Sequence, residues 1–398
     1  MNIQLKEVTT LRDLKAFIRF PFSLYQENPY WVPRLFSDEY HTLRRDKNPA
    51  FENCEAKYWL AFKDGRIAGR IAGIISRPYI EKWEQRYMRF GWIDFIDDAA
   101  VSEALLNAVE SWAKEAGMAA VHGPLGFTDL DPEGMLVEGF EELGTMATIY
   151  NHPYYVTHME RMGYVKDVDW VEYELTGPVE PVETIARIAD VVMRRYKLRL
   201  LEIKRKEELL PFAGELFQLL GNEYRHLYAV VPLTEKQVDI YVKKFFGFVV
   251  PDFLPIVLDE NDQMIAFGVA MPSLSRALQK ARGNLLPFGF LHVLRALKEN
   301  DRVDLYLTAV RSDFHGKGVN AILIDRMHRG FKKFGITKVE SNPELETNSQ
   351  VREQWKHFES RQHKRRRCFI KQLEVDSPRL SLDEKTEPPM DRVDFNHG

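Results

Sequence analysis

The amino-acid sequence predicts a mixed α/β protein in which two similar domains follow one another, each a mixed central sheet flanked by helices. Three observations predict it. Alternating apolar residues at 303–309 indicate a strand, and apolar residues at helical spacing over 319–334 indicate a helix beyond a glycine-bearing turn. Asp64-Gly65 joins two alternating stretches, which is typical of a β-hairpin. The order of elements in the first half recurs in the second, which favours duplication of a unit of about 180 residues.

The first half alternates strands with helices. We expect a strand at 2–9, a helix at 11–25 kinked or broken at Pro21, a hairpin formed by 58–62 and 67–76, a strand at 90–96, a helix at 100–116 closed by Gly117, and a strand at 118–122. A loop rich in glycine, aspartate and proline then runs from Gly123 to Gly134. This order is the unit that the second half repeats.

The second half begins after a predicted linker, Gly177-Pro178-Val179-Glu180-Pro181, so the expected domains are 1–177 and 178–374. We expect a strand at 198–204, helices at 207–220 and 235–246, a hairpin formed by 255–258 and 264–271, a strand at 303–310, a helix at 319–334, a strand at 337–341, a helix at 348–359 and a last strand at 366–373. The basic run from His363 to Arg367 is typical of a solvated strand edge, and the alternative is a site for a phosphate or another acidic ligand. Acidic residues and prolines dominate from 375 to 398, which predicts a disordered acidic tail.

Composition narrows the class of protein. The 398 residues are 45% hydrophobic and 29% charged, which is globular, and the formal net charge of -4 argues against nucleic acid as a partner. No apolar run reaches the roughly 18 residues that a membrane span needs, and the N-terminus does not resemble a signal peptide. The two cysteines, Cys54 and Cys368, have no zinc-binding spacing, so we expect no metal. A cytoplasmic protein is the simplest interpretation, and the oligomeric state stays open.

The turn between the strand at 303–310 and the helix at 319–334 is the strongest candidate site. Gly316 and Gly318 flank Lys317, and such a turn can leave several backbone N–H groups pointing one way. Together with the positive end of the helix dipole, these groups favour a phosphate or a pyrophosphate. The alternative is that the two glycines only make a tight turn. The longer glycine spacings of the P-loop and of the dinucleotide fingerprint are absent.

The run from His315 to Asn320 resembles the coenzyme A pyrophosphate turn of GNAT (Gcn5-related N-acetyltransferase) acyltransferases, which reads Arg or Gln, two residues, Gly, one residue, then Gly or Ala. Gly318 takes the central glycine, whereas His315 replaces Arg or Gln and Asn320 replaces Gly or Ala. The whole chain except the tail is similar to a family of tandem GNAT-like bacterial proteins. The stretches that carry this similarity are 20–25, 28–29, 31–33, 65–73, 123–124, 150–155, 163–164, 286–289 and 345–348.

This resemblance implies an acetyl-coenzyme A or a longer acyl-coenzyme A as co-substrate. The residues that it places at the coenzyme are Val310, His315, Gly316, Lys317, Gly318, Val319 and Asn320. The corresponding position of the first half, 96–100, has no glycine and carries Asp97 and Asp98. Two carboxylates would repel a pyrophosphate by about 1 kcal/mol or more per charge pair, so we expect the donor in the second half.

The resemblance also implies direct acyl transfer to an amine, with a base, a backbone N–H that stabilises the oxyanion, and an acid that is often a tyrosine. Phe358 stands at the tyrosine position, and Met159 stands at the matching position of the first half, so both acids are missing. The candidate catalytic residues are therefore Glu346, Asn348, Tyr306 and Glu340, with Glu344 also near the place of a base. Alternatively, Asn348 caps a helix and Glu346 is a solvated loop charge.

The long loops of the first half offer a candidate substrate pocket, because loops of this length are uncommon in compact domains unless they have a functional role. Its candidate residues are Phe127, Thr128, Asp129, Asn151, Tyr154 and Tyr155. The alternative is that these residues pack the two domains together.

The function that these observations predict is N-acyl transfer from acetyl- or acyl-coenzyme A to an unidentified small-molecule amine, using the C-terminal domain. A long acyl chain is one variant, because the apolar stretch 285–297 could line a tunnel, although core packing explains it equally. The alternative function is a catalytically degenerate protein that binds a ligand without turnover. The missing tyrosine favours this alternative, and Gly316-Lys317-Gly318 favours the enzyme.

Overall fold

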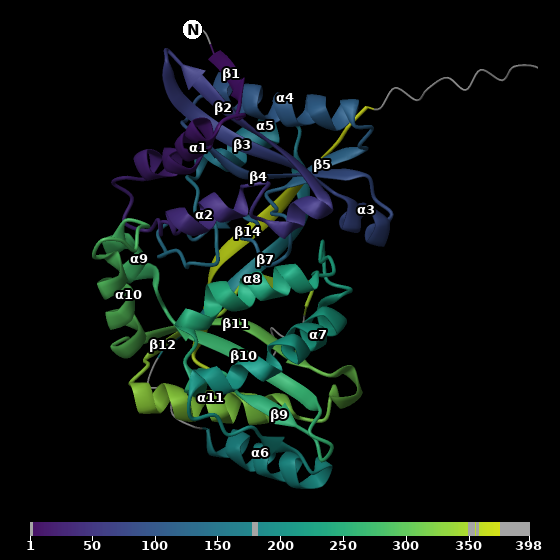
Figure 1. Ribbon diagram of the computed structural model, residues 1–398, viewed down its shortest axis with the longest axis vertical. Coiled ribbons are helices and arrows are strands. Elements are labelled where there is room, and N and C mark those ends of the chain that lie inside the picture. The colour runs from purple at the N-terminus through teal and green to yellow at the C-terminus, as the bar shows by residue number, and fades with distance from the viewer. Residues whose placement is uncertain (1–2, 177–181, 349–354, 356–357, 375–398) are drawn as a thin grey trace, which may run out of the picture.

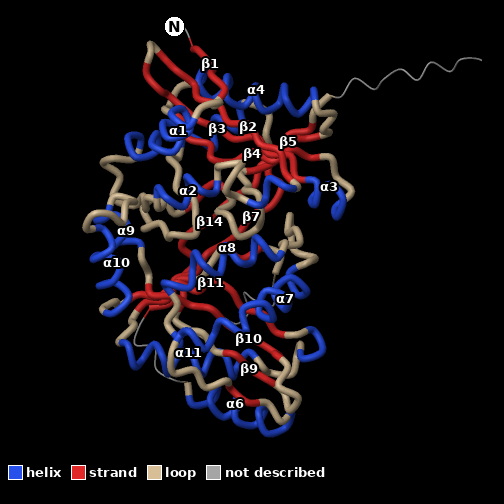
Figure 2. The backbone as a smooth tube through the Cα atoms, in the orientation of Figure 1, coloured by secondary structure: helices blue, strands red, loops and turns tan. Residues whose placement is uncertain are grey.

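The computed structural model describes residues 3–176, 182–348, 355 and 358–374 (Figure 1). The predicted linker at 177–181, most of the predicted helix at 348–359 and the predicted tail at 375–398 lie outside these residues. Within them, the strands of both halves form one sheet, which Figure 2 shows as red segments running from the first half into the second. The mixed α/β architecture that the sequence predicts is confirmed.

The sheet follows a simple order. It runs β1 (Ile3–Glu7), β2 (Cys54–Lys63), β3 (Arg66–Ser76), β4 (Tyr87–Phe95), β5 (Ala120–Gly123), β14 (Ser360–Gln372), β7 (Val165–Thr176), β12 (Lys338–Glu340), β11 (Arg302–Val310), β10 (Met264–Pro272), β9 (Ile256–Leu258) and β8 (Arg199–Leu200). Two short strands lie off this path, β6 (Met135–Glu138) on β14 and β13 (Glu344–Leu345) on β7.

The two halves exchange their closing strands. In each half an antiparallel series ends in a parallel pair, β4 with β5 and β11 with β12. The next strand after β5 is β14, which ends the second half of the chain, and the next strand after β12 is β7, which ends the first half. β7 and β14 pair antiparallel with each other, from Leu175 opposite Ser360 to Val165 opposite Ile370. Each half of the sheet is therefore completed by a strand from the other half.

Helices cover both faces of the first half. Along β2, Trp59 and Ala61 face a core that contains Val101, Leu105 and Val109 of α4 (Ala99–Glu115). Because successive strand residues point to opposite faces, Tyr58 and Leu60 face the core under α1 (Leu11–Leu24) and α2 (Phe36–Thr42). α3 (Arg77–Trp83) follows β3, and α5 (Tyr154–Arg161) packs in the same core as α4.

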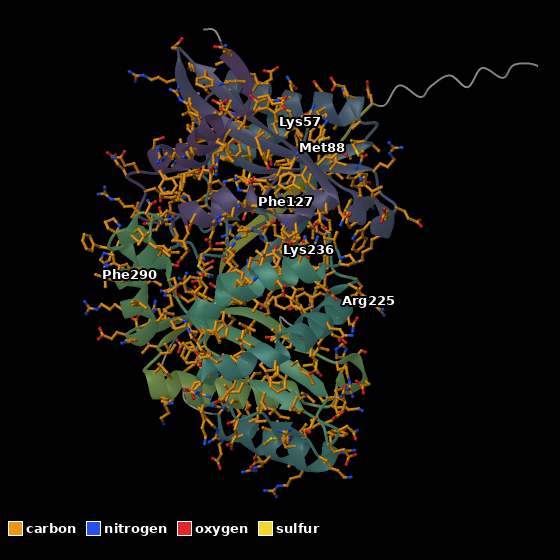
Figure 3. All side chains as sticks on the ribbon, viewed as in Figure 1. Lys57, Met88, Phe127, Arg225, Lys236 and Phe290 are labelled. Carbon is orange, nitrogen blue, oxygen red and sulfur yellow. The ribbon has the colours of Figure 1, made fainter. Side chains whose placement is uncertain are left out.

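The second half has the same layered construction. Val257 of β9 faces the core under α6 (Glu183–Tyr196) and α11 (Asn320–Phe334). Ile256 and Leu258 point the other way, toward α7 (Ala213–Tyr224), and α8 (Glu235–Phe245) follows α7. Between β10 and β11 the chain makes α9 (Ser275–Ala281) and α10 (Gly289–Lys298), which project at one side of the sheet, with Phe290 at the outer edge (Figures 1 and 3).

Several elements differ from the sequence prediction. The strand expected at 198–204 is only the two residues of β8. The first turns of the helix expected at 207–220 are a 3₁₀ helix, Lys206–Phe212, because Pro211 removes a backbone donor. β7 was not predicted, because its buried Asp169, Glu172 and Glu174 hide the apolar alternation.

Basic side chains of β14 neutralise the buried carboxylates of β7. Lys364 Nζ lies 3.2 Å from Glu172 Oε2 and also binds Glu340 of β12, and Arg366 binds Glu172. Although burial alone would raise the pKa of Glu172, the charges of Arg366 and Lys364 lower it to about 2. Lys364 and Arg366 are each 1% exposed, so the basic run is not the solvated strand edge that the sequence suggested.

Candidate functional site

The sheet opens beside β11. This strand pairs with β12 only over Arg302–Asp304, opposite Lys338–Glu340, whereas it stays paired with β10 as far as Val310. After Glu340 the chain leaves β11, so the edge of Leu305–Val310 faces a space that we call the strand gap. Asn342 Nδ2, on the departing segment, donates to the Tyr306 carbonyl at 3.1 Å.

A β-bulge lies at the start of the strand gap. On β10, Val269 and Ala270 are consecutive, but they oppose Leu307 and Leu305, so Tyr306 is the extra residue of β11. A bulge re-aims the backbone that follows it. The carbonyls of Thr308 and Val310 accept hydrogen bonds from Tyr224 Oη at 3.0 Å and His315 Nε2 at 2.7 Å. Since the N–H and C=O of a strand residue point to the same side, backbone donors also face the strand gap.

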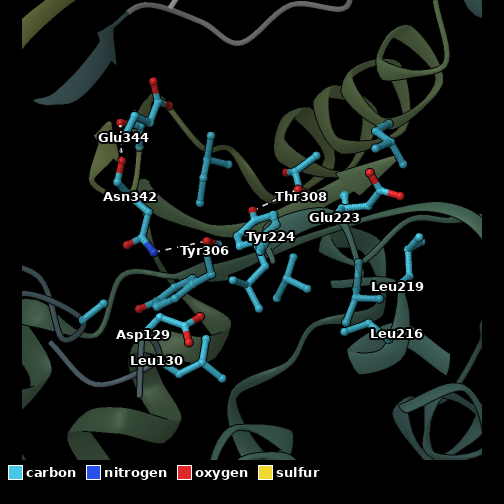
Figure 4. A pocket seen from close by; sticks show the side chains of 18 of the residues that line it. Asp129, Leu130, Leu216, Leu219, Glu223, Tyr224, Tyr306, Thr308, Asn342 and Glu344 are labelled. Atoms are coloured by element: carbon cyan, nitrogen blue, oxygen red, sulfur yellow. Dashed lines mark hydrogen bonds between the residues drawn. The ribbon is translucent and has the colours of Figure 1, made fainter. Parts of the chain in front are cut away.

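The strand gap opens into a cavity of about 2340 Å³ that both halves line (Figure 4). Ligand pockets usually measure about 300–1,000 Å³, so this volume suits a large ligand or two ligands together. One wall is apolar and comes mainly from the segment before α7, from α7 itself and from neighbouring strands; it includes Leu209, Leu216, Leu219, Leu254, Ile256 and Val269. The first half contributes Leu35, Asp129, Leu130, Glu133 and Met146.

The glycine turn forms one end of this cavity. Gly316 and Gly318 have φ of 71° and 80°, the left-handed region that favours glycine, and a Cβ on Gly318 would lie 3.1 Å from Val192 Cγ2. Among the hydrogen bonds of the described chain, the N–H groups of Gly316, Gly318, Val319 and Asn320 meet no backbone carbonyl. These donors stand at the N-terminus of α11, so the turn has the geometry of an anion site.

The side chains around the turn are already engaged. Lys317 Nζ lies over the rings of Phe314 and Tyr196, at 4.8 and 5.3 Å from their centroids. Glu223, at the end of α7, accepts the Ser312 N–H at 2.9 Å, and its carboxylate lies 3.3 Å from His315 Nε2. Glu223 therefore brings a carboxylate to Ser312 and His315, where the turn begins, a feature that sequence reasoning missed because Glu223 is about 90 residues away in the chain.

The candidate catalytic residues separate into two groups. Tyr306 and Asn348 line the cavity. Burial, together with the carboxyls of Asp304 and Glu340, raises the pKa of Tyr306 above its usual range, so its hydroxyl stays protonated. Glu340 is 2% exposed and bound to Lys364 and Arg302, away from the cavity wall.

Glu346 is also off the cavity wall. Its carboxylate forms ion pairs with Lys166 and, at 2.9 Å, with Arg365 Nη1. These two cations hold it against β7 and β14, so it is not the solvated loop charge of the alternative interpretation either. Its neighbour Glu344 does line the cavity, where Trp355 Nε1 donates to both carboxylate oxygens at 3.0 and 2.9 Å.

Tyr224 was also missed by the sequence reasoning. Its hydroxyl donates to the Thr308 carbonyl in the strand gap, and burial raises its pKa to about 12. The spacing of Leu216, Leu219, Leu220 and Glu223 before it marks one face of a helix, and that signal could have placed Tyr224 with them. Phe358, at the usual tyrosine position, lines the cavity, whereas Met159 is buried in the first-half core.

The candidate substrate residues of the first half do not form one pocket. Tyr154 Oη donates to the Phe95 carbonyl at 2.5 Å, and Tyr155 Oη accepts the Phe95 N–H at 2.9 Å, so both tie α5 to β4. Asn151 bonds the N–H and carbonyl of Leu136 at 2.7 and 3.0 Å. These three side chains stabilise the fold, because their polar atoms form hydrogen bonds with backbone groups.

Of the remaining candidates, Asp129 lies at the cavity. Phe127 packs against Phe51 and Trp92, and Thr128 Oγ1 shares a hydrogen bond of 2.6 Å with Tyr241 Oη of α8. Burial raises the pKa of Asp129 and also, with the charge of Asp129, that of Glu133, which lines the same wall. Asp129 Oδ1 has no partner within the described residues.

Two clusters contain residue types that can bind a metal ion, and in each of them another protein side chain lies among the potential ligand atoms. In the set Glu172, Glu340 and His363, the Lys364 ammonium lies between the carboxylates. In the set His122, Asp167 and Cys368, the Tyr228 hydroxyl contacts all three side chains.

Across the residues that the structure describes, no helix combines the length and apolar character that crossing a membrane requires.

Comparisons with known proteins agree with this architecture. No protein-family model matches the chain. Protein YghO of Escherichia coli (strain K12) is 29% identical over 370 residues, which cover 91% of this chain and 93% of that protein. The bacterial ceramide synthase of Caulobacter vibrioides is 27% identical over 300 residues, which cover 73% of this chain and 75% of that protein.

Solved structures match the fold at low sequence identity. A tandem GNAT protein from the clavulanic acid biosynthesis pathway matches with a TM-score of 0.54 and 10% identity, over 93% of this chain and 98% of that one. A GCN5-related glucosamine N-acetyltransferase region of a fungal multi-domain protein matches with a TM-score of 0.53 and 13% identity, over 93% of this chain and 38% of that one. The sheet that opens beside a bulged strand and a glycine turn is therefore a GNAT-like fold. The chain therefore has a tandem GNAT-like fold, as the sequence resemblance implies.

Proposed function

We propose that this protein is an N-acyltransferase that joins a long acyl group, delivered on coenzyme A, to the amino group of an amine with an apolar chain. The observation that carries the proposal is the cavity, which combines the glycine turn, an open strand edge, apolar walls and half-buried carboxyls in one space. A short acetyl group and a small amine would leave most of about 2340 Å³ unfilled.

The donor end is supported by the glycine turn and by the strand gap. The four N–H groups of the turn and the dipole of α11 suit a pyrophosphate. The open edge of β11 suits an extended chain with amide groups, which can add to a strand edge by backbone hydrogen bonding. We place the donor in the second half, because Asp98 caps α4 at the equivalent turn of the first half, where its carboxylate accepts the N–H groups of Ala100 and Val101.

The acceptor end is supported by Asp129 and Glu133. Both carboxyls are half-buried and form no ion pair within the described residues, which suits an ammonium group, and a carboxyl with a raised pKa is better able to take a proton. The relationship to a bacterial ceramide synthase points the same way. A ceramide is an amide of a fatty acid and a long-chain amino alcohol, so both of its parts would find apolar walls here.

The chemistry that the bound donor supplies is a thioester: the amine nitrogen bonds to the acyl carbon, the carbon–sulfur bond breaks, and the amine proton ends on the departing thiol. We assign the role of acid to Tyr306, because this residue lines the cavity beside the strand gap and its hydroxyl carries a proton at neutral pH. Glu344 takes the role of a base, because it lines the cavity, whereas Glu346 and Glu340 lie off the cavity wall. Asn348 lines the same wall and would orient the substrates.

A second candidate function is ligand binding without turnover. Two observations favour it: Phe358 has no proton to give, and the carboxylate of Glu223 stands beside the turn that would hold the pyrophosphate.

The test is calorimetric titration with acetyl-coenzyme A and with palmitoyl-coenzyme A, followed by mass spectrometry of mixtures with a long-chain amino alcohol. Gly318→Glu places a carboxylate in the turn and should abolish donor binding. Gly335→Glu is the matched control, because Gly335 has a φ of 70° at the other end of α11 and open space around its Cβ. We expect binding in the control and the wild type, and an N-acylated product. Failure of the wild type to bind either donor would overturn the proposal, and binding without product would favour the second candidate.

A further inference from the structure

A concentrated apolar surface lies on α10 and the loop before it. Of the thirteen exposed large hydrophobic side chains in the described chain, five fall within nine residues, and the two most exposed of the thirteen are Leu286 at 79% and Phe288 at 71%. The others are Phe290, Leu291 and Leu294, and Figure 3 shows Phe290 at the outer edge of the molecule. We call these five side chains the α10 patch.

The α10 patch differs from both sequence expectations for 285–297. None of the residues at 285–297 lines the cavity, so the stretch is not the wall of a tunnel. Core packing accounts for only part of it, since Val293 is buried while Leu285 and Leu297 are half-buried. Exposure of this much apolar surface by a protein without a bound partner marks an interaction site.

Charge around the α10 patch identifies the kind of partner. Between Ser275 and Glu299 there are five cationic side chains, all exposed, and a single carboxylate: Arg276, Lys280, Arg282, Arg295, Lys298 and Glu299. The formal charge of this segment is +4, whereas that of the whole chain is -4. Apolar side chains with lysine and arginine beside them are typical of elements that lie in the interface of an anionic membrane.

The α10 patch is also connected to the cavity. On their inner side, Val293, Leu285 and Leu297 pack in one apolar cluster with Leu35, Met146 and Phe248. The last three side chains also line the cavity. A single layer of apolar side chains therefore separates the exposed surface from the cavity wall.

We propose that α9, α10 and the loop between them dock on the surface of an anionic phospholipid membrane. The five side chains of the α10 patch enter the apolar layer below the headgroups, and the surrounding basic side chains meet the lipid phosphates. This orientation brings the cavity to the membrane, where long-chain substrates reside. Docking itself requires only the α10 patch and its charges, and delivery of a lipid to the cavity rests on the proposed function.

The test is co-sedimentation of the full chain with vesicles of phosphatidylcholine alone and of phosphatidylcholine with phosphatidylglycerol. We expect binding to the anionic vesicles that weakens with salt. The double variant Phe288→Ser/Leu291→Ser should lose it. Since a basic side chain at a membrane surface contributes roughly fivefold, Lys280→Gln/Lys298→Gln should reduce it about 25-fold. The matched control is Ile188→Ser/Val191→Ser on α6, which removes two exposed apolar side chains elsewhere and should bind like the wild type.

Absence of wild-type binding to anionic vesicles, or an equal loss in the α6 control, would overturn the proposal. A second copy of the chain is the other occupant to consider. It would be identified by a dimer in analytical ultracentrifugation that the Phe288→Ser/Leu291→Ser variant dissociates, without vesicle binding, and that result would also overturn membrane docking. Titration of the α10 variant with palmitoyl-coenzyme A in solution separates this inference from the proposed function, because donor binding should be unchanged.

Discussion

Glu223 is the side chain whose position bears most directly on donor binding. Its carboxylate accepts the Ser312 N–H and lies 3.3 Å from His315 Nε2, where the glycine turn begins. A negative charge there stabilises the empty turn and opposes a pyrophosphate in the same place. Under the proposed function, the affinity for coenzyme A therefore depends partly on a residue of α7, outside the turn itself.

We predict that Glu223→Gln tightens coenzyme A binding. Removing one repulsive charge of about 1 kcal/mol lowers the dissociation constant roughly fivefold, and the amide can still accept the Ser312 N–H. Calorimetric titration measures the change. The control is Glu215→Gln. Glu215 lies on the same helix, about 12 Å before Glu223, and its carboxylate accepts the Met264 N–H. An unchanged affinity in Glu223→Gln would place the pyrophosphate elsewhere.

Asp304 is a second residue with an unusual environment. It lies opposite Glu340 in the parallel pair of β11 and β12, and neither of its buried oxygens has a hydrogen bond of good geometry within the described residues. Burial and the Glu340 carboxylate raise the pKa of Asp304 to about 8, so the folded protein keeps this carboxyl protonated near neutral pH.

The consequence for stability follows from proton linkage. An aspartate in the unfolded chain has a pKa near 3.9. The contribution of Asp304 to the free energy of unfolding is therefore fully present below about pH 4, and it is lost as the pH rises to about 8. We predict that Asp304→Asn removes this loss. The slopes of the free energy of unfolding against pH should differ between the two proteins by at most about 1.4 kcal/mol per pH unit. Urea unfolding of both proteins from acidic to mildly alkaline pH measures it. Parallel stability curves for the two proteins would contradict the raised pKa.

Among the elements, β14 carries an unusual combination of burial and charge. It pairs with β5 and β7, and its lysine and arginine side chains meet carboxylates of β7 and β12. Buried carboxylates tolerate this position only while a cation stays with them. Loss of one cation should therefore cost more than loss of an exposed ion pair on the same strand.

We predict that Lys364→Met lowers the free energy of unfolding by about 3–5 kcal/mol, because Glu172 and Glu340 lose a shared partner in the interior. Lys371→Met is the control on the same strand. Its ion pair with Glu110 is more exposed, so the change should stay below about 1 kcal/mol. Chemical denaturation measures the free energy of unfolding of both variants. Similar losses in the two would show that burial of the Lys364 ion pairs does not increase their contribution to stability.

The sequence predicts well those elements whose turns and ends are marked by residues close together in the chain. Asp64-Gly65 takes positive φ at both residues, as a two-residue hairpin requires, and Gly117 follows α4 with φ of 65°. The glycine turn lies where its spacing indicates. The elements that were missed or shortened, such as β7 and β8, depend on partners that the local sequence does not reveal.

At the scale of the whole molecule, the exchange of β7 and β14 joins the two halves in one sheet. Neither half of the sheet is complete without a strand from the other, and the two exchanged strands form a long pair with each other. The predicted boundary at 177–181 separates the two halves in sequence, whereas β7 before it and β12 after it pair in one sheet.

We predict that the fragments 1–177 and 178–374 do not fold when each is produced separately, and that they form a stable complex when produced together. The reason is that each fragment leaves the edge of β5 or β12 unpaired and exposes the apolar side chains beneath it. Circular dichroism, limited proteolysis and co-purification test this. A stable, folded fragment 1–177 on its own would show that the exchanged strand is dispensable.

The sequence by itself determined the tandem arrangement, the glycine turn and most strands and helices, because these depend on residues close together in the chain. Only the tertiary structure decided which residues share the cavity. Glu223, Tyr224, Asp129 and Glu344 meet there from separate parts of the chain, while Tyr154, Tyr155 and Asn151 are used to hold the first half together. Lys364 and Glu172 pair across 192 positions of sequence, a contact that exists only because the closing strands are exchanged.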